Sequence, residues 1–224
     1  MKHLLIAGGA MLALTACGGT AEKTASEKVA DIAQTIETNN NLGALEKAQA
    51  DLDAIIADAT NTINEASAVK SKATIAIGSS FLTKNATSDG VITSESGLQY
   101  KVIQPGLENG AQATPGQGIA AHYHGFFIDK EVFDSSYQRG NPLTGPSNGF
   151  IKGWNEALGE MKVCEARTLF INSDLAYGDN GRGGIPGGAT LLFNMQLLAV
   201  NGSGDEEIHE CPEDKILSGP EAYN

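Results

Sequence analysis

Residues 118–128 read GIAAHYHGFFI, an apolar and aromatic run that predicts a long β-strand. GLQYKVI, at residues 97–103, alternates in the manner of a second strand and stops before a Pro-Gly pair. A short apolar segment predicts a helix over residues 155–161, and two further strands are expected at residues 166–171 and 190–200. Several strands around one short helix indicate an α+β domain in which an antiparallel sheet wraps the helix.

The composition of the 224-residue chain changes along its length. All seven prolines lie from Pro105 onward, and the aromatic residues begin at Phe81. The first third is instead rich in Ala, Glu, Lys and Asp, which favours helices over strands. The formal net charge is −12, and no basic stripe could neutralise phosphates, so nucleic acid is not expected as a partner.

Residues 1–16, MKHLLIAGGAMLALTA, have the proportions of a secretory signal peptide, because an early lysine precedes an apolar run too short to cross a bilayer. Residues 14–17 read LTAC, which resembles a bacterial lipobox. Cys17 is therefore predicted to be lipidated, and several acyl chains on one residue would hold the protein firmly at a membrane. The alternative is an ordinary secretion signal. We therefore expect the protein to be located in the cell envelope, held by its lipid anchor at the periplasmic or the surface face of the outer membrane.

Residues 17–85 are predicted to form a tether and a helical stalk. A break near Gly43 separates a short helix over residues 26–38 from a long one over residues 44–84. A seam of near-heptad spacing follows the long helix through Leu45, Gln49, Leu52, Ile56, Ala59, Ile63, Ala66, Lys70, Ala73 and Ile77. Such a helix needs a packing partner, and a second copy of the chain is the expected one. The alternatives are the short helix or the C-terminal domain.

Six short motifs follow one another in the C-terminal part of the chain. They are HYHG at 122–125, FDSS at 133–136, RGNPL at 139–143, GFIKGW at 149–154, DLAYG at 174–178 and GGIPGGATLLF at 183–193. Together they resemble the FKBP-type peptidyl-prolyl cis-trans isomerases over residues 97–201. The stretch at residues 79–100 is similar to the junction between stalk and isomerase in periplasmic, Mip-like lipoproteins of this family. The resemblance implies an FKBP-like domain over residues 86–201 and a homodimer formed through the N-terminal helices.

The resemblance also implies a set of pocket residues. The catalytic residues would be Tyr123, Phe133, Asp134, Trp154 and Tyr177. The substrate-binding residues would be Arg139, Leu143, Phe150, Ile151, Ile185 and Phe193. Taken alone, each has another interpretation, since a single tryptophan in a small domain more often belongs to the core; only their joint spacing favours a site.

In the implied pocket, Trp154 forms the floor, and the Ile151 backbone N–H and the Tyr177 hydroxyl bind carbonyl groups of a peptide. Asp134 pairs with Arg139 or Tyr123. The family's reaction needs no cofactor and no metal. We therefore expect isomerisation of proline-containing polypeptide clients, which would assist the folding of exported proteins. The alternative is a dimeric chaperone, holdase or surface adhesin in which isomerase activity is secondary.

Two cysteines remain if Cys17 is acylated, and a disulfide between Cys164 and Cys211 is expected because an exported chain meets an oxidising compartment. The FKBP arrangement places the strands next to these cysteines side by side. Two free thiols are the alternative. Residues 202–224 hold seven acidic side chains and one lysine, so a solvated, partly disordered tail is predicted. His122 and His124 share one face of a strand, and no metal site is expected there.

Overall fold

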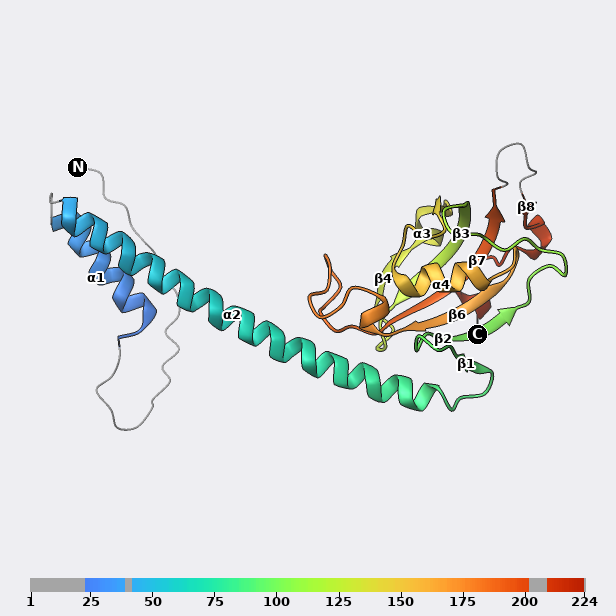
Figure 1. The fold of residues 1–224 in the computed structure, drawn as a ribbon, viewed down its shortest axis with the longest axis horizontal. Helices are drawn as coiled ribbons and strands as arrows, with labels where there is room; N and C mark the ends of the chain where they lie inside the picture. The colour runs from blue at the N-terminus through green and yellow to red at the C-terminus, as the bar shows by residue number, and fades with distance from the viewer. Residues whose placement is uncertain (1–22, 39–41, 202–208, 224) are drawn as a thin grey trace. The chain divides into compact units, whose positions relative to one another are not determined.

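The computed structural model describes residues 23–38, 42–201 and 209–223. Helix α1 (Ala25–Thr38) and the 44-residue helix α2 (Leu42–Asn85) form the predicted stalk, close to the expected bounds (Figure 1). Among the described residues, no helix is long and apolar enough to span a membrane.

The chain divides into two compact units inside α2, between Thr62 and Ile63. Residues 63–85 of α2 therefore belong to the same unit as the sheet, upstream of the boundary expected at residue 86. Three isoleucines of the predicted seam, Ile56, Ile63 and Ile77, are 55%, 67% and 64% exposed. The described part of the chain leaves these seam positions uncovered.

One antiparallel sheet dominates the second unit, with eight strands among the described residues. The strands are β1 (Val91–Thr93), β2 (Gln99–Gln104), β3 (Gly118–Phe126), β4 (Val132–Ser135), β5 (Leu143–Pro146), β6 (Ala166–Ile171), β7 (Leu191–Val200) and β8 (His209–Glu210). Their order is β1-β2-β6-β7-β3-β4, with β5 on β3 and β8 on β7. The central strand β7 pairs with β6 and β3, which places Phe193 between Leu169 and Gly125. The sequence predicted four of these strands, β2, β3, β6 and β7, and each predicted end lies within two residues of the observed one.

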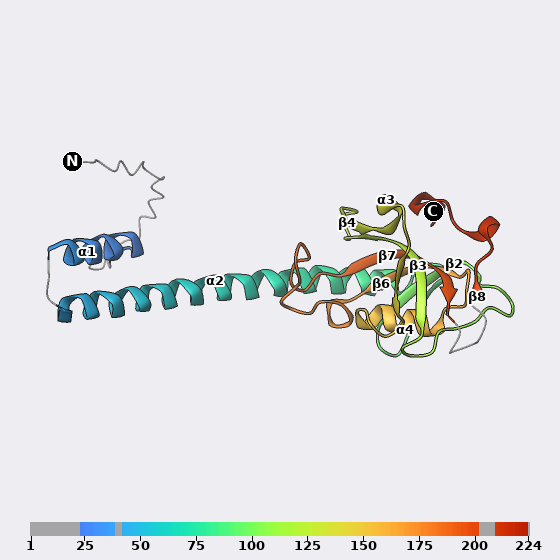
Figure 2. The same ribbon diagram turned by 90° about the horizontal axis from the view of Figure 1, so that it is seen from above.

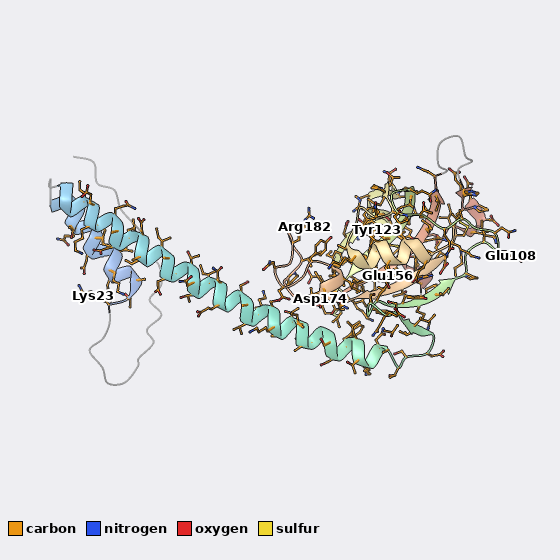
Figure 3. All side chains as sticks on the ribbon, viewed as in Figure 1. Lys23, Glu108, Tyr123, Glu156, Asp174 and Arg182 are labelled. Carbon is orange, nitrogen blue, oxygen red and sulfur yellow. A yellow bond between two sulfur atoms is a disulfide. The ribbon has the colours of Figure 1, made fainter. Side chains whose placement is uncertain are left out.

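Helix α4 (Lys152–Glu160) lies on one face of the sheet (Figures 1 and 2). Trp154, Ala157, Leu158 and Met161 recur with helical spacing, and all four side chains are buried. Glu156, labelled in Figure 3, lies on another side of the helix. Its carboxylate accepts hydrogen bonds of 2.6 Å from the hydroxyls of two serines in the β1–β2 turn. The predicted fold class, an antiparallel sheet around one short helix behind a helical stalk, is confirmed.

Four shorter helices complete the described elements. They are α3 (Ser136–Arg139) and the 3-10 helices η1 (Ser173–Leu175), η2 (Glu213–Lys215) and η3 (Pro220–Tyr223).

The prediction of a solvated tail is wrong for residues 209–223. Strand β8 pairs with the end of β7, and Tyr223 is buried. The Gln196 side chain donates to the Lys215 carbonyl at 2.9 Å and accepts from the Leu217 backbone at 2.8 Å. The acidic composition concealed this docking, because backbone pairing and a few apolar side chains hold the segment while its carboxylates stay in water.

A disulfide joins Cys164 to Cys211, the expected pair, across a sequence separation of 47 residues. Both cysteines are buried, and Cys211 N–H also donates to the Leu198 carbonyl at 2.7 Å. The bridge fastens the start of the docked C-terminal segment to the turn before β6.

Replacing Cys164 and Cys211 together by Ala should lower the free energy of unfolding by about 2–4 kcal/mol, because the bridge restricts the unfolded chain. Urea unfolding of the exported mature protein measures this difference. Wild-type protein unfolded in the presence of a reducing agent is the matched control, since it loses the bridge and keeps both cysteine side chains. An unchanged unfolding midpoint in the double variant would contradict the prediction.

Candidate functional site

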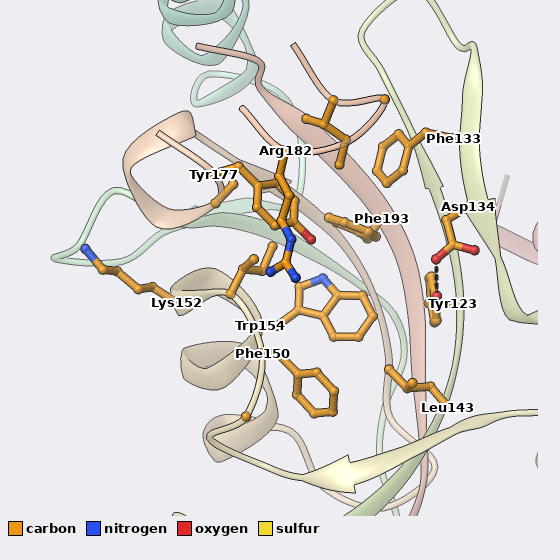
Figure 4. Close-up of a pocket in the computed structure, with 15 residues that line it drawn as sticks. Tyr123, Phe133, Asp134, Leu143, Phe150, Lys152, Trp154, Tyr177, Arg182 and Phe193 are labelled. Atoms are coloured by element: carbon orange, nitrogen blue, oxygen red, sulfur yellow. Dashed lines mark hydrogen bonds between the residues drawn. The ribbon is translucent and has the colours of Figure 1, made fainter. Parts of the chain in front are cut away.

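A cavity of about 690 Å³ opens beside the N-terminal end of α4 (Figure 4). Its size falls in the range of small-ligand and peptide sites. The lining residues come from β3, β4, β5, β7, the start of α4 and the loop after η1: Tyr123, Phe133, Asp134, Leu143, Gly149, Phe150, Ile151, Lys152, Trp154, Ala176, Tyr177, Arg182, Gly184, Ile185 and Phe193.

Aromatic rings pack around Trp154, which is 5% exposed. The rings of Tyr123 and Phe193 stand nearly perpendicular to the indole, with centroids 4.9 and 5.0 Å from it. Phe150 lies 5.5 Å away on another side. Edge-to-face contacts of this kind hold the rings rigidly and add stabilisation beyond burial. The result is a preformed apolar floor.

Gly125 makes the aromatic wall possible. A Cβ atom at this position of β3 would lie 2.7 Å from the Phe133 ring and 2.8 Å from the Phe193 ring. Those two rings meet at a centroid distance of 5.5 Å and an angle of 87°. Any larger residue at position 125 would push them apart, so this glycine in the HYHG motif serves the pocket through its lack of a side chain.

The polar edge of the cavity is a network of three side chains. The Tyr123 hydroxyl donates a hydrogen bond to Asp134, and Arg139 forms an ion pair with the same carboxylate. Arg139 Nη2 also donates to the Tyr123 oxygen at 2.6 Å. Each oxygen of Asp134 is thus held by a different partner, which fixes the carboxylate beside the apolar floor.

Burial raises the pKa of Tyr123 to about 12, and the hydrogen bond to Asp134 raises it as well. The phenol therefore stays protonated at physiological pH and remains a donor to Asp134. The pKa of Arg139 is also raised, chiefly by its hydrogen bond to Tyr123.

The start of α4 presents a backbone donor to the cavity. Ile151 caps the helix in an extended conformation, and its N–H makes no hydrogen bond to another described residue. Asn155 fixes the preceding turn, because its side chain accepts from Phe150 N–H at 3.0 Å and donates to the Phe150 carbonyl at 3.2 Å. An N–H group at the first turn of a helix is a ready donor for a ligand carbonyl.

The loop between η1 and β7 forms the remaining wall. It brings Tyr177 and Ile185 to the cavity together with Arg182 (Figure 4). Arg182 and Ile185 exchange two backbone hydrogen bonds of 3.0 Å, which close the loop's tip. No described side chain hydrogen-bonds to the Tyr177 hydroxyl, so that group can bind a ligand.

Comparisons with known proteins agree with this geometry. A family model described as FKBP-type peptidyl-prolyl cis-trans isomerase matches residues 109–198, and one for the domain amino terminal to it matches residues 9–102. FK506-binding protein 2 of Emericella nidulans is 42% identical over 106 residues, which cover 78% of that protein and 46% of this chain. The chain belongs to the FKBP family.

Bacterial members of the family are also similar to this chain. The FKBP-type 22 kDa isomerase of Escherichia coli is 44% identical over 130 residues, 58% of this chain and 62% of that protein. The Mip isomerase of Coxiella burnetii is 42% identical over 121 residues, 54% of this chain and 52% of its own length. The crystal structure of FkpA from Escherichia coli superposes with a TM-score of 0.61 at 28% identity and covers 84% of this chain and 83% of that one.

Ten of the eleven pocket residues expected from the FKBP resemblance line the cavity. The remaining one, Arg139, stands behind the wall and reaches the site only through Asp134 and Tyr123. Five lining residues were not among the expected ones: Gly149, Lys152, Ala176, Arg182 and Gly184. Four of them lie inside the FKBP motifs, so the motifs themselves carried the signal, and Arg182 directly precedes the last motif.

The two histidines of the HYHG motif do not line the FKBP cavity. His122 Nδ1 lies 2.9 Å from the Ser136 hydroxyl, and its ring stacks on Tyr137 at 4.5 Å. Burial lowers the pKa of both His122 and His124, which favours the neutral imidazoles.

Replacing Asp134 by Asn should lower the pKa of Tyr123 below about 12, because the carboxylate that disfavours the phenolate is lost while Arg139 remains. Titration of the tyrosinate absorbance in the ultraviolet measures the change in pKa. The Tyr123→Phe variant identifies which step of the titration belongs to Tyr123, because that step is missing from it. Asp129→Asn, at an exposed turn carboxylate, is the matched control. A Tyr123 pKa unchanged from wild type would rule out Asp134 as a cause of the raised value.

Proposed function

We propose that this chain catalyses cis-trans isomerisation of the peptide bond that precedes proline. The observation that carries the proposal is the Trp154 floor, an apolar surface framed by perpendicular aromatic rings. Membership of the FKBP family supports it. Donors at the edge of the cavity and apolar groups at its base match a proline ring flanked by peptide carbonyls.

The chemistry needs no reactive side chain. Rotation about the C–N bond faces a barrier of about 18–20 kcal/mol, because the twisted amide loses its resonance. The twisted amide is also less polar than the planar one, so a surface that excludes water favours it over the ground state. Binding that is stronger for the twisted form lowers the barrier, and each 1.4 kcal/mol or so gives about a tenfold rate increase.

Each group of the cavity has a role in this scheme. Trp154, Phe133 and Phe193 contact the pyrrolidine ring. The Ile151 N–H and the Tyr177 hydroxyl hold carbonyl groups of the peptide and keep its backbone still while the prolyl bond turns. Asp134, oriented by Tyr123 and Arg139, sits beside the twisting carbonyl and fixes the polarity of the edge. Preorganised groups of this kind cost no rearrangement during the reaction.

Removing the Tyr177 hydroxyl should reduce kcat/KM for an X-Pro peptide by about 1–3 kcal/mol, because a buried hydrogen bond to the substrate is left unmade. Trp154→Ala should reduce activity further. A protease-coupled isomerase assay on the mature chain measures both. Tyr137→Phe is the matched control, since it deletes a hydroxyl outside the cavity. Full activity in Tyr177→Phe would remove Tyr177 from the site, and full activity in Trp154→Ala would overturn the proposed function.

We further propose that α2 pairs with a second copy of the chain. The exposed isoleucines of its seam support this, because an apolar stripe on a long helix is stable in water only when it is covered. The near-heptad spacing favours another helix of the same kind as the cover.

The mature chain should therefore have the mass of a dimer by light scattering, and Ile56→Asp with Ile63→Asp should convert it to a monomer that keeps its isomerase activity. Each aspartate would place a charge in the seam without partners. Substituting aspartate at Ala54 and Asn61, which are exposed and lie outside the seam, is the control. A monomeric wild-type chain would contradict the proposal.

Localisation at the cell envelope, with proline-containing exported proteins as clients, is also part of the proposed function. Its support is the signal-like start and the LTAC motif, and Cys17 itself lies outside the described residues. Replacing Cys17 by Ala should release the protein from the membrane fraction into the soluble fraction, as shown by immunoblot after fractionation. A variant that stays membrane-bound would mean that another anchor exists.

A further inference from the structure

The loop of residues 176–188, here the active-site loop, carries one wall of the cavity. At its base, Gly188 N–H donates to the Gly178 carbonyl at 2.9 Å, and Gly178 N–H donates to the Ser173 carbonyl at 2.8 Å. Tyr177 directly precedes Gly178 in the chain. The position of these hydrogen-bonded residues therefore determines where the Tyr177 ring lies in the cavity.

Helix α2 packs against that base, within the compact unit that begins at Ile63. A Cβ atom at Gly188 would lie 2.6 Å from both the Ser71 carbonyl oxygen and Ile75 Cγ1. A Cβ atom at Gly187 would lie 3.3 Å from Ser71 Oγ. The loop backbone therefore lies against the surface of the helix at Ser71 and at the Ile75 side chain, and no side chain of the loop separates Gly187 and Gly188 from the helix.

One turn further along, Gly78 brings α2 against Thr190, two residues after the end of the loop. A Cβ atom at Gly78 would lie 2.2 Å from Thr190 Oγ1, so only glycine permits this approach. The helix end is anchored independently of the loop, because Phe81 packs on Phe170 of β6 at 6.1 Å and the Leu82 carbonyl accepts from the Gln99 side chain at 3.0 Å. The helix is thus a fixed support.

The contact is confined to the base of the loop. Beside it, α2 and the loop enclose a cavity of about 390 Å³, which Lys72, Asp179 and Asn180 help to line. Ser71 is 6% exposed, and its hydroxyl has no hydrogen-bond partner among the described residues. Ser71 therefore allows the close approach of Gly187 and Gly188 because its side chain is small, and not because it forms a hydrogen bond.

We propose that Ser71, Ile75 and Gly78 are positioning residues that hold the active-site loop against the prolyl-binding cavity. This inference rests on the proposed function and adds α2 to the machinery of the same site. A larger side chain at position 71 or 78 displaces the base of the loop outward. Tyr177 and Ile185 then withdraw from the cavity, which weakens peptide binding and exposes Trp154 to water.

The test uses the full mature chain and its single tryptophan, Trp154, as a reporter of the cavity. Ser71→Leu and Gly78→Leu should shift the Trp154 emission to longer wavelength and raise KM at least about fivefold with little change in kcat, since uniform substrate binding is lost. Leucine is a better helix former than glycine, so a weaker helix would not explain the effect of Gly78→Leu.

Ala76→Leu is the matched control, because it enlarges an exposed position of the same helix. It should keep the wild-type emission and KM. If Ala76→Leu changed the emission and KM as much as Ser71→Leu does, the proposal would be overturned, because the loop contact would then not be the cause.

Wild-type emission and KM in folded Ser71→Leu and Gly78→Leu proteins would also overturn it. If these variants do not fold, Ile75→Ala, which removes the support under Gly188, should change emission and KM in the same direction, and wild-type values there would count against the proposal. A wild-type chain without isomerase activity would instead refute the proposed function. The emission of Trp154 would still decide whether α2 positions the loop.

Discussion

Burial of one face of α4 against the sheet is the interaction on which the rest of this structure depends. A nine-residue helix has almost no stability in water by itself, so it forms only where the sheet covers it. Leu158 and Met161 are fully buried, and burying a side chain of this size contributes about 1.5–3 kcal/mol. The same face carries Trp154, so the contact that stabilises the domain also builds the floor of its cavity.

The two faces of β6 contact different helices, α4 on one side and α2 on the other. Ile171 points toward α4 and lies against Gly153, whereas the neighbouring Phe170 contacts Phe81 of α2 on the opposite side. The sheet is therefore held between a helix that forms the site and a helix that supports its loop. Arg139 adds orientation rather than stability, because its ion pair with Asp134 is about half exposed and such pairs contribute little.

Much of the fold could be predicted from the sequence, because local patterns carry it. A short apolar segment placed α4 within three residues of its start. The composition of the first third and the break near Gly43 located both stalk helices, and apolar or alternating runs located the long strands. The pocket residues were predictable as a group, since Tyr123, Phe133, Trp154 and their neighbours occur in motifs whose order and spacing are specific. Arg139 was expected in the pocket but lies behind it, because a motif fixes a residue's place in the chain and not the direction of its side chain.

By itself, the sequence determined the fold class, the family, the Cys164–Cys211 pair and the apolar seam of α2. Only the tertiary structure decided that residues 209–223 dock, and that α2 carries a second stripe at Ser71, Ile75 and Gly78. Neither the docking of the tail nor the second stripe could be predicted from an apolar pattern in the sequence. The tail is held by backbone pairing and a disulfide, and the stripe by close approach at small residues. Such contacts depend on the shape of a distant surface, which is set only when the chain has folded.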